Sequence, residues 1–211
     1  MNMNRVLILG GNNSLGQIIA RQLLNAGMSV TVFSEGESDN KISHQRYQHV
    51  KGDVYNILSV ENIIASHDAV ISVYTSTYLW KLFYLRDALQ NILRSMTEQN
   101  VNRFIFFHYS HNESYYTKGL IPSPFFKRIF VRNYDEKTRK IFFEDLKKCS
   151  LVYTINYLDW NFLKLVSSHE TNKSIKRYYF SIAEEVQRQL TQNNSHFKEV
   201  YHKSPESKIP A

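Results

Sequence analysis

The sequence of 211 residues contains little cysteine, glycine or proline, and these shortages narrow what the chain can be. Its one cysteine, Cys149, excludes an internal disulfide, so a cytoplasmic, reducing compartment is the simplest setting. Four prolines and no low-complexity run leave no convincing linker. No apolar stretch approaches the roughly 20 residues that a membrane span requires, and the first apolar run is too short for a signal peptide. The sequence therefore predicts one cytoplasmic globular domain over residues 1–211.

Charge is distributed unevenly along the chain. Residues 1–120 hold 10 Lys/Arg against 9 Asp/Glu, whereas residues 121–211 hold 16 against 10. A basic half can attract phosphate, nucleic acid or an anionic surface. Here the basic residues are interleaved with acidic ones and form no dense block, which favours an ordinary solvated surface. Neither nucleic acid nor a membrane is expected as a partner.

Short apolar runs alternate with helix-like segments over the first 156 residues. Strands are expected at 5–10, 29–33, 48–51, 69–73, 104–108, 152–156 and 197–202, and helices at 14–26, 56–66, 78–99, 134–148 and 181–191. Such alternation is typical of right-handed crossovers. The predicted fold class is α/β and Rossmann-like, with a doubly wound parallel sheet in three α/β/α layers. Its core is expected over residues 4–156, with a small substrate-side region over 157–211.

The stretch RVLILGGNNSLGQIIARQLL, residues 5–24, joins a buried strand to an amphipathic helix through an opening turn, residues 10–13. A dinucleotide site needs small residues here for a tight turn, for close approach to pyrophosphate and for helix packing. Gly10 and Gly16 suit the first and third tasks, while Asn13 stands at the second. Asn tolerates positive φ better than most residues, but its side chain would crowd the phosphates. The alternative is an inert turn that only caps a helix.

Ligands of such sheets bind beyond the carboxyl ends of the strands. After the second strand, Glu35 would accept from a ribose 2′-OH and repel a 2′-phosphate, which favours NAD over NADP. Lys41 and Arg46 lie nearby in sequence, and a solvated carboxylate is an equally good interpretation of Glu35. Asp53 would accept from the adenine amino group or cap the following helix. The predicted cofactor-binding residues are Gly10, Asn12, Asn13, Ser14, Leu15, Gly16, Ser34, Glu35, Asp53, Val54, Ser72, Val73 and Tyr74.

Candidate catalytic residues follow the fifth predicted strand: Ser110 first, then Tyr109 and His111. Ser110 would bond the nicotinamide amide or the substrate, since hydride transfer mainly needs positioning. A flavin or quinone acceptor needs no strong acid from the protein, whereas a ketone would need a proton donor. Cys149 is interpreted as structural. No metal-ligand spacing is seen and no Walker-type lysine follows the turn, so neither a metal nor phosphoryl transfer is expected.

Five motifs follow one another along the chain: GGNNSLG, VKGDV, HDAVISV, EQNVNRFIFFHYS and LVYTINYLDW. In order and spacing they resemble the atypical short-chain dehydrogenase/reductase family, specifically its compact branch of NmrA-like and biliverdin/flavin reductase-like proteins, over residues 4–200. The first motif stands where that family carries a G-x-x-G-x-x-G turn. The resemblance implies NAD or NADP as cofactor, an adenine contact from Asp53 and a serine, Ser110, near the nicotinamide.

The chain departs from this family in three places. Asn13 replaces the middle glycine, Asn156-Tyr157 replaces an Arg-Pro pair, and the Tyr-x-x-x-Lys dyad of the wider superfamily is missing. Its spacing recurs only at Tyr47 and Lys51, on the third predicted strand. Three functions stay open: a reductase of a flavin, quinone or related small acceptor, a catalytically silent NAD(P) sensor of the NmrA type, and, ranked last, a sugar-nucleotide epimerase. The helix over 78–99 could support a homodimer, although ordinary packing also explains its apolar stripe.

Overall fold

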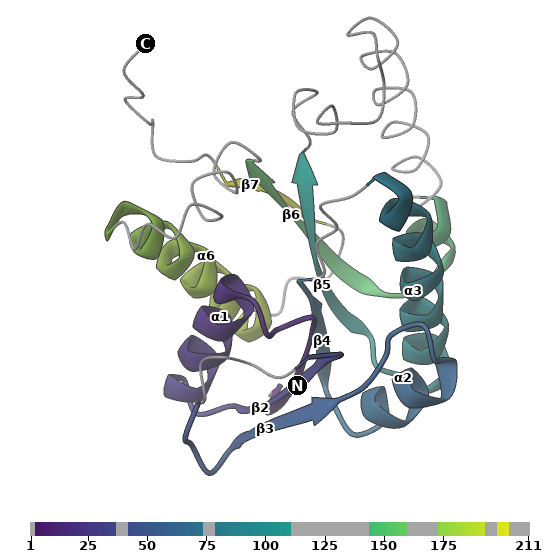
Figure 1. Cartoon of the computed structure of the whole chain (residues 1–211), viewed down its shortest axis with the longest axis horizontal. Coiled ribbons are helices and arrows are strands. Elements are labelled where there is room, and N and C mark those ends of the chain that lie inside the picture. Colours follow the sequence, from purple (N-terminus) through teal and green to yellow (C-terminus); the bar gives the residue numbers. More distant parts are fainter. Residues whose placement is uncertain are drawn as a thin grey trace, which may run out of the picture.

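The computed structural model describes residues 3–36, 42–73, 79–110, 144–159, 173–192 and 198–202 (Figure 1). The strands are β1 (Arg5–Leu9), β2 (Ser29–Ser34), β3 (Tyr47–Lys51), β4 (Ala69–Ser72), β5 (Arg103–Ser110), β6 (Val152–Asp159) and β7 (Lys198–His202). The helices are α1 (Ser14–Asn25), α2 (Ile57–Ile64), α3 (Leu79–Glu98) and α6 (Lys173–Thr191). Residues 144–148 are also helical, within the helix predicted over 134–148; residues 134–143 lie outside the described residues.

The seven strands form one parallel sheet in the order β3-β2-β1-β4-β5-β6-β7. The chain builds outward from β1 to β3, then returns across β1 to add β4 on its other side. The carboxyl ends of β1 and β4 therefore flank the point at which the strand order reverses, where doubly wound sheets bind ligands. The predicted fold class is confirmed.

Helices cover both faces of the sheet, with α1 and α6 on one side and α2 and α3 on the other (Figure 1). In β1, Val6 and Ile8 pack in the core beneath α1 and α6, while Leu7 and Leu9 pack in the core beneath α2 and α3. All four side chains are fully buried. A strand buried on both faces has no polar alternation, which explains the continuous apolar run in the sequence.

Helix α1 matches its prediction to within one residue, and α6 does not. The C-cap of α1 is Ala26, and the following Gly27 has φ 89, a conformation that glycine adopts without strain. Helix α6 begins at Lys173, eight residues before the predicted start, so that boundary was wrong. Its buried stripe of Tyr178, Tyr179, Ile182, Ala183, Val186 and Leu190 packs with α1. Basic residues on the exposed side of its first turns obscured this period in the sequence.

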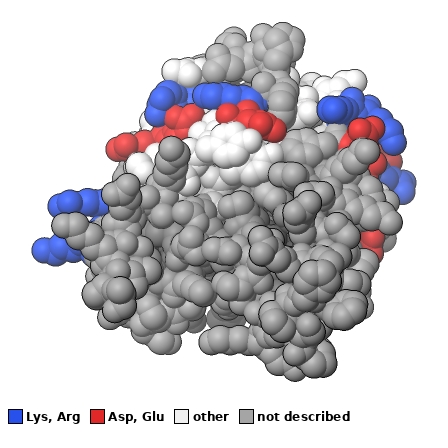
Figure 2. Space-filling model, turned by 90° about the horizontal axis from the view of Figure 1, so that it is seen from above, with Lys and Arg blue, Asp and Glu red and all other residues white. Residues whose placement is uncertain are grey.

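The charged residues of the described part are partly paired. Glu185 on α6 contacts Arg188 at 2.6 Å and Lys198 at 3.3 Å. Figure 2 shows described Lys and Arg beside Asp and Glu on the face seen from above, and not gathered in a field of one sign. In the described ranges, no helix is both long and apolar enough to cross a membrane.

Candidate cofactor site

The opening turn has the backbone geometry that its glycines predict. Gly10 follows β1 with φ 73, and its N–H donates to the carbonyl of Phe33 at 2.8 Å. On the first turn of α1, a Cβ added to Gly16 would lie 2.5 Å from the Cα of Gly11. That distance is far inside van der Waals contact, so only glycine lets α1 approach the turn this closely. Gly10 makes the tight turn and Gly16 is the packing glycine, as predicted.

Asn13 does not adopt the conformation expected of it. Its φ is −80 and its ψ is 167, so the predicted tolerance of positive φ is not used. Asn13 is instead the N-cap of α1: its Oδ1 accepts from the N–H of Gly16 at 2.8 Å. Its Nδ2 donates to the carbonyls of Gly10 at 3.1 Å and Val73 at 3.2 Å. Within the described residues, the Asn13 side chain bonds only to main-chain atoms of Gly10, Gly16 and Val73, so it is directed toward the backbone where β1 and β4 end.

The start of α1 offers two unpaired backbone donors. The N–H of Gln17 bonds to the carbonyl of Asn13, and that of Gly16 is taken by the Asn13 side chain. In the described part of the chain, the N–H groups of Ser14 and Leu15 donate to no acceptor. Ser14 is exposed, and the helix dipole adds partial positive charge here. Two free donors at a helix start beside the strand-order reversal suit a diphosphate.

At the end of β2, Ser34 and Glu35 differ sharply in environment. Ser34 is 2% exposed, and its hydroxyl donates to the Gly36 carbonyl at 2.8 Å. Because that hydroxyl has a single proton, His49 on β3 must donate from Nε2 to the Ser34 Oγ, 2.9 Å away. Glu35 is exposed. The structure therefore leaves the Glu35 carboxylate, and not the Ser34 hydroxyl, available at the place where a ribose was predicted.

Beyond β3, the structure corrects the helix-capping prediction. Asp53 is exposed, and its Oδ1 accepts from the N–H of Tyr55 at 2.8 Å, which forms a local turn. The N-cap of α2 is Asn56, whose Oδ1 accepts from the N–H of Ser59 at 3.2 Å. Asp53 lies too early in the chain to reach the free amides of α2. Val54 is fully buried in the core beneath α2 and α3.

The remaining predicted residues follow β4 and β5. Ser72 and Val73 are buried at the end of β4, and the Val73 N–H donates to the Leu9 carbonyl at 3.0 Å. Tyr109 and Ser110 are the last residues of β5 and pair in register with Leu158 and Asp159 of β6. The side chains of Tyr109 and Ser110, and all of Tyr74 and His111, lie outside the described residues. The structure thus brings the carboxyl ends of β1, β2, β4 and β5 together along one edge of the parallel sheet, the edge at which the strands end.

Sequence reasoning missed two residues that support this edge. His49 holds the Ser34 hydroxyl, as described above. Gln17 is 3% exposed, and its Nε2 donates to the carbonyl of Gly11 at 2.9 Å, so it braces the turn from inside. A glutamine next to the apolar stripe of α1 was the only signal in the sequence, and it resembles an ordinary polar helix residue.

The Tyr-x-x-x-Lys spacing lies far from the predicted nicotinamide position. Tyr47 and Lys51 are the first and last residues of β3, the edge strand of the sheet. Three strands, β2, β1 and β4, separate β3 from β5. Tyr47 also packs against the core beneath α1. This pair therefore does not supply the dyad at the end of β5.

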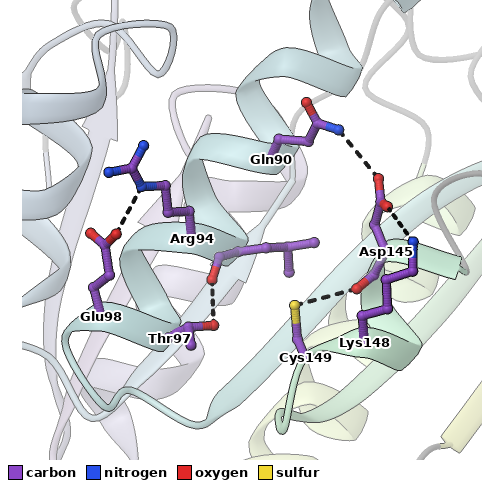
Figure 3. A pocket seen from close by; sticks show the side chains of 8 residues that line it. Gln90, Arg94, Thr97, Glu98, Asp145, Lys148 and Cys149 are labelled. Carbon is purple, nitrogen blue, oxygen red and sulfur yellow. Dashed lines mark hydrogen bonds and ion pairs between the residues drawn. The ribbon is translucent and has the colours of Figure 1, made fainter.

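A hollow of about 370 Å³ lies elsewhere, between α3 and the helical residues 144–148 (Figure 3). Its polar groups are paired with one another: Gln90 donates to Asp145 at 3.3 Å, and Arg94 contacts Glu98 at 2.8 Å. The Cys149 thiol donates to the Asp145 carbonyl at 3.3 Å, and burial raises its pKa. A raised thiol pKa disfavours the nucleophilic thiolate, in agreement with a structural role. None of the predicted site residues lines this hollow.

Across the described ranges, no group of three His, Cys, Asp or Glu residues is arranged to hold a metal ion. The site therefore has to be understood from its backbone donors and polar side chains.

Comparison with known proteins identifies the family. Residues 10–177 match the family described as NAD(P)H-binding. The chain belongs to the NAD(P)H-binding family. Membership assigns NAD(P) binding to the chain. The matched span includes the opening turn and every predicted site residue.

The chain is also similar to one curated protein over a short stretch and to solved structures over most of its length. Ipsdienol dehydrogenase of Ips pini is 44% identical over 48 residues, 23% of this chain, and the matched stretch is 19% of that enzyme's length. The Bordetella bronchiseptica enzyme WbmH, solved with NAD+, has a TM-score of 0.64 at 16% identity, over 93% of this chain and 75% of that one. A short-chain dehydrogenase/reductase from Veillonella parvula, solved with NADP, has a TM-score of 0.63 at 15% identity, over 97% and 99%. At these identities, the two structures support the fold.

Proposed function

We propose that the chain is an NAD(P)-dependent reductase that transfers a hydride to a flavin, a quinone or a related small acceptor. The observation that carries the proposal is the pair of N–H groups, Ser14 and Leu15, that have no acceptor among the described residues and lie at the strand-order reversal. The neighbouring strands β4 and β5 end at the same edge, and β5 ends at Ser110. A cofactor that spans from α1 across this edge would bring its nicotinamide to the end of β5.

In this proposal, each residue at this edge contacts a different part of the cofactor. The N–H groups of Ser14 and Leu15 hold the pyrophosphate, Asp53 accepts from the adenine, and Ser110 orients the nicotinamide amide or the substrate. When bound, NAD(P)H supplies the hydride. The chain contributes binding and orientation, because the reactivity resides in the nicotinamide.

The acceptor class follows from the missing dyad. A ketone would need a proton donor beside it, and Tyr47 and Lys51 lie on the far edge strand β3. A flavin or quinone can take its proton from water. An acceptor of this kind therefore suits a site without a tyrosine–lysine pair.

NAD is the preferred cofactor in this proposal. The exposed Glu35 carboxylate accepts from the ribose 2′-OH, and it repels the additional phosphate of NADP. The buried Ser34 hydroxyl is already engaged by Gly36 and His49 and offers no competing donor for a 2′-phosphate.

A second candidate function is a catalytically silent NAD(P) sensor of the NmrA type. The position of the only Tyr-x-x-x-Lys spacing on β3 favours this alternative as well, because it leaves the end of β5 without that dyad. Such a protein would bind the cofactor and present its surface to a partner without oxidising NAD(P)H.

Two measurements on the whole chain separate these functions. NADH and NADPH are titrated by fluorescence, and oxidation is then followed with FMN and with a soluble quinone. Binding with turnover supports the reductase, and tight binding without oxidation supports the sensor. Failure to bind either dinucleotide would overturn both. Ser110→Ala is expected to lower turnover, while Ser59→Ala on α2 serves as the matched control; full activity in Ser110→Ala would discard the role given to that serine.

A further inference from the structure

Asn13 makes contacts that a cap residue does not need. A cap requires only an acceptor for a free N–H of the first turn, and the Asn13 Oδ1 provides it to Gly16 at 2.8 Å. The Nδ2 group makes two more bonds, to the Gly10 carbonyl at 3.1 Å and to the Val73 carbonyl at 3.2 Å. Both amide protons are used, so the side chain bridges the start of the opening turn, the first turn of α1 and the end of β4.

These Asn13 bonds link the segment that would hold the pyrophosphate to the segment on the nicotinamide side. Gly10 and Gly16 belong to the segment that meets the pyrophosphate, whereas Val73 follows β4, toward the nicotinamide side. Val73 is fully buried, its N–H donates to the Leu9 carbonyl at 3.0 Å, and its own carbonyl accepts from Asn13, so the backbone on both sides of the Val73 Cα is held in place. Asn13 lies 60 residues before Val73 in the chain, so nothing local enforces this contact.

We propose that Asn13 is a positioning residue for the nicotinamide half of the cofactor. By bonding the opening turn to the end of β4, it holds the two segments in their binding arrangement before the cofactor arrives, which lowers the ordering cost of binding. This inference rests on the NAD(P) site described above. It reverses the expectation from sequence, in which the Asn13 side chain only crowds the phosphates.

The substitution Asn13→Ser tests the bond to Val73 separately from the N-cap role of Asn13. Serine is as good an N-cap as asparagine, but its hydroxyl is too short to reach Val73. We expect Asn13→Ser to weaken NADH binding by about 5- to 30-fold, because two neutral hydrogen bonds are lost. ADP, which carries the adenosine and both phosphates but no nicotinamide riboside, should bind within about twofold of the wild type. Asn13→Gly should weaken NADH binding at least as much as the serine variant.

The matched control is Asn56→Ser at the N-cap of α2, where the Asn56 side chain makes the same capping bond and, among the described residues, no second bond. Its affinity for NADH and ADP should equal that of the wild type. The change in its melting temperature shows how much stability is lost when an N-cap asparagine is replaced by serine. If Asn13→Ser loses affinity for NADH and ADP equally, or binds both as the wild type does, Asn13 acts only as an N-cap and the proposal is wrong. Tighter NADH binding by Asn13→Gly would show that the side chain obstructs the site. Failure of the wild type itself to bind NADH would instead remove the proposed function.

Discussion

Gly16 lies so close to Gly11 that the helix and the turn share a glycine–glycine contact: a Cβ on Gly16 would stand 2.5 Å from the Gly11 Cα and 2.8 Å from its carbonyl oxygen. The neighbouring atoms are backbone and cannot move aside as a flexible side chain would. This contact sets how near the free N–H groups of Ser14 and Leu15 come to the end of β1.

Gly16→Ala is expected to destabilise the fold and weaken cofactor binding together. Pushing α1 away from the turn costs about 1–3 kcal/mol of unfolding free energy, as overpacking does in a rigid site. Urea denaturation measures this change, and NADH titration measures the loss of affinity. Gly36→Ala is the control for the stability measurement, because among the described residues a Cβ there meets only the Asn12 side chain at 3.5 Å, an ordinary contact. Equal behaviour of the two variants would show that the close contact is not required.

A second glycine prediction concerns Gly52, which follows β3. An added Cβ would overlap the ring of Phe33, a core residue that is 2% exposed. Gly52→Ala should lower the unfolding free energy by about 1–3 kcal/mol. In a Phe33→Leu background the same substitution should cost less, because the overlapping ring is gone. A double-mutant cycle by urea denaturation measures the difference, and identical costs in both backgrounds would contradict the overlap.

The sheet was predictable because its information is local. The strands β1, β2, β4 and β5 are short, mostly apolar runs, and the helices between strands predict a parallel order. The start of α6 was not predicted, since its first turns expose Lys173, Lys176 and Arg177. Burial of Tyr178 and Tyr179 against α1 stabilises the helix from this earlier start. Contacts between segments far apart in the sequence cannot be predicted from either segment alone.

The location of the site could be predicted from the sequence, but the conformations and contacts of its residues could not. Four strand ends could be assigned to one edge from topology alone. The conformation of Asn13 could not, because asparagine suits both positive φ and an N-cap, and Val73 decides between them from 60 residues away. The engagement of Ser34 by His49 depends in the same way on the register between β2 and β3.

Stability should fall as the solution becomes mildly acidic, partly through His67. Burial lowers the pKa of His67, although its bond to the Ile63 carbonyl acts in the opposite direction. The unfolded chain then binds a proton more readily, near pH 6.5. The stability that His67 contributes is therefore complete above that pH and is lost as pH falls below it. Burial also lowers the pKa of His202, which adds to the same trend.

The unfolding free energy, measured in urea between pH 8 and pH 5.5, tests this sign. His67→Asn should show a smaller loss over that range than the wild type, even if it is less stable at pH 8. An unchanged pH dependence in His67→Asn would mean that His67 does not titrate differently on folding.

The choice between NADH and NADPH should depend on the charge of Glu35. A carboxylate near a 2′-phosphate in water repels it by about 1 kcal/mol, or roughly fivefold in affinity. Glu35→Gln should therefore tighten NADPH binding relative to NADH by about that factor, and added salt should reduce the difference. Parallel fluorescence titrations give the ratio of the two dissociation constants. Glu184→Gln, at an exposed position on α6, removes the same charge elsewhere. If both variants change the ratio equally, net charge and not the position of Glu35 governs the preference.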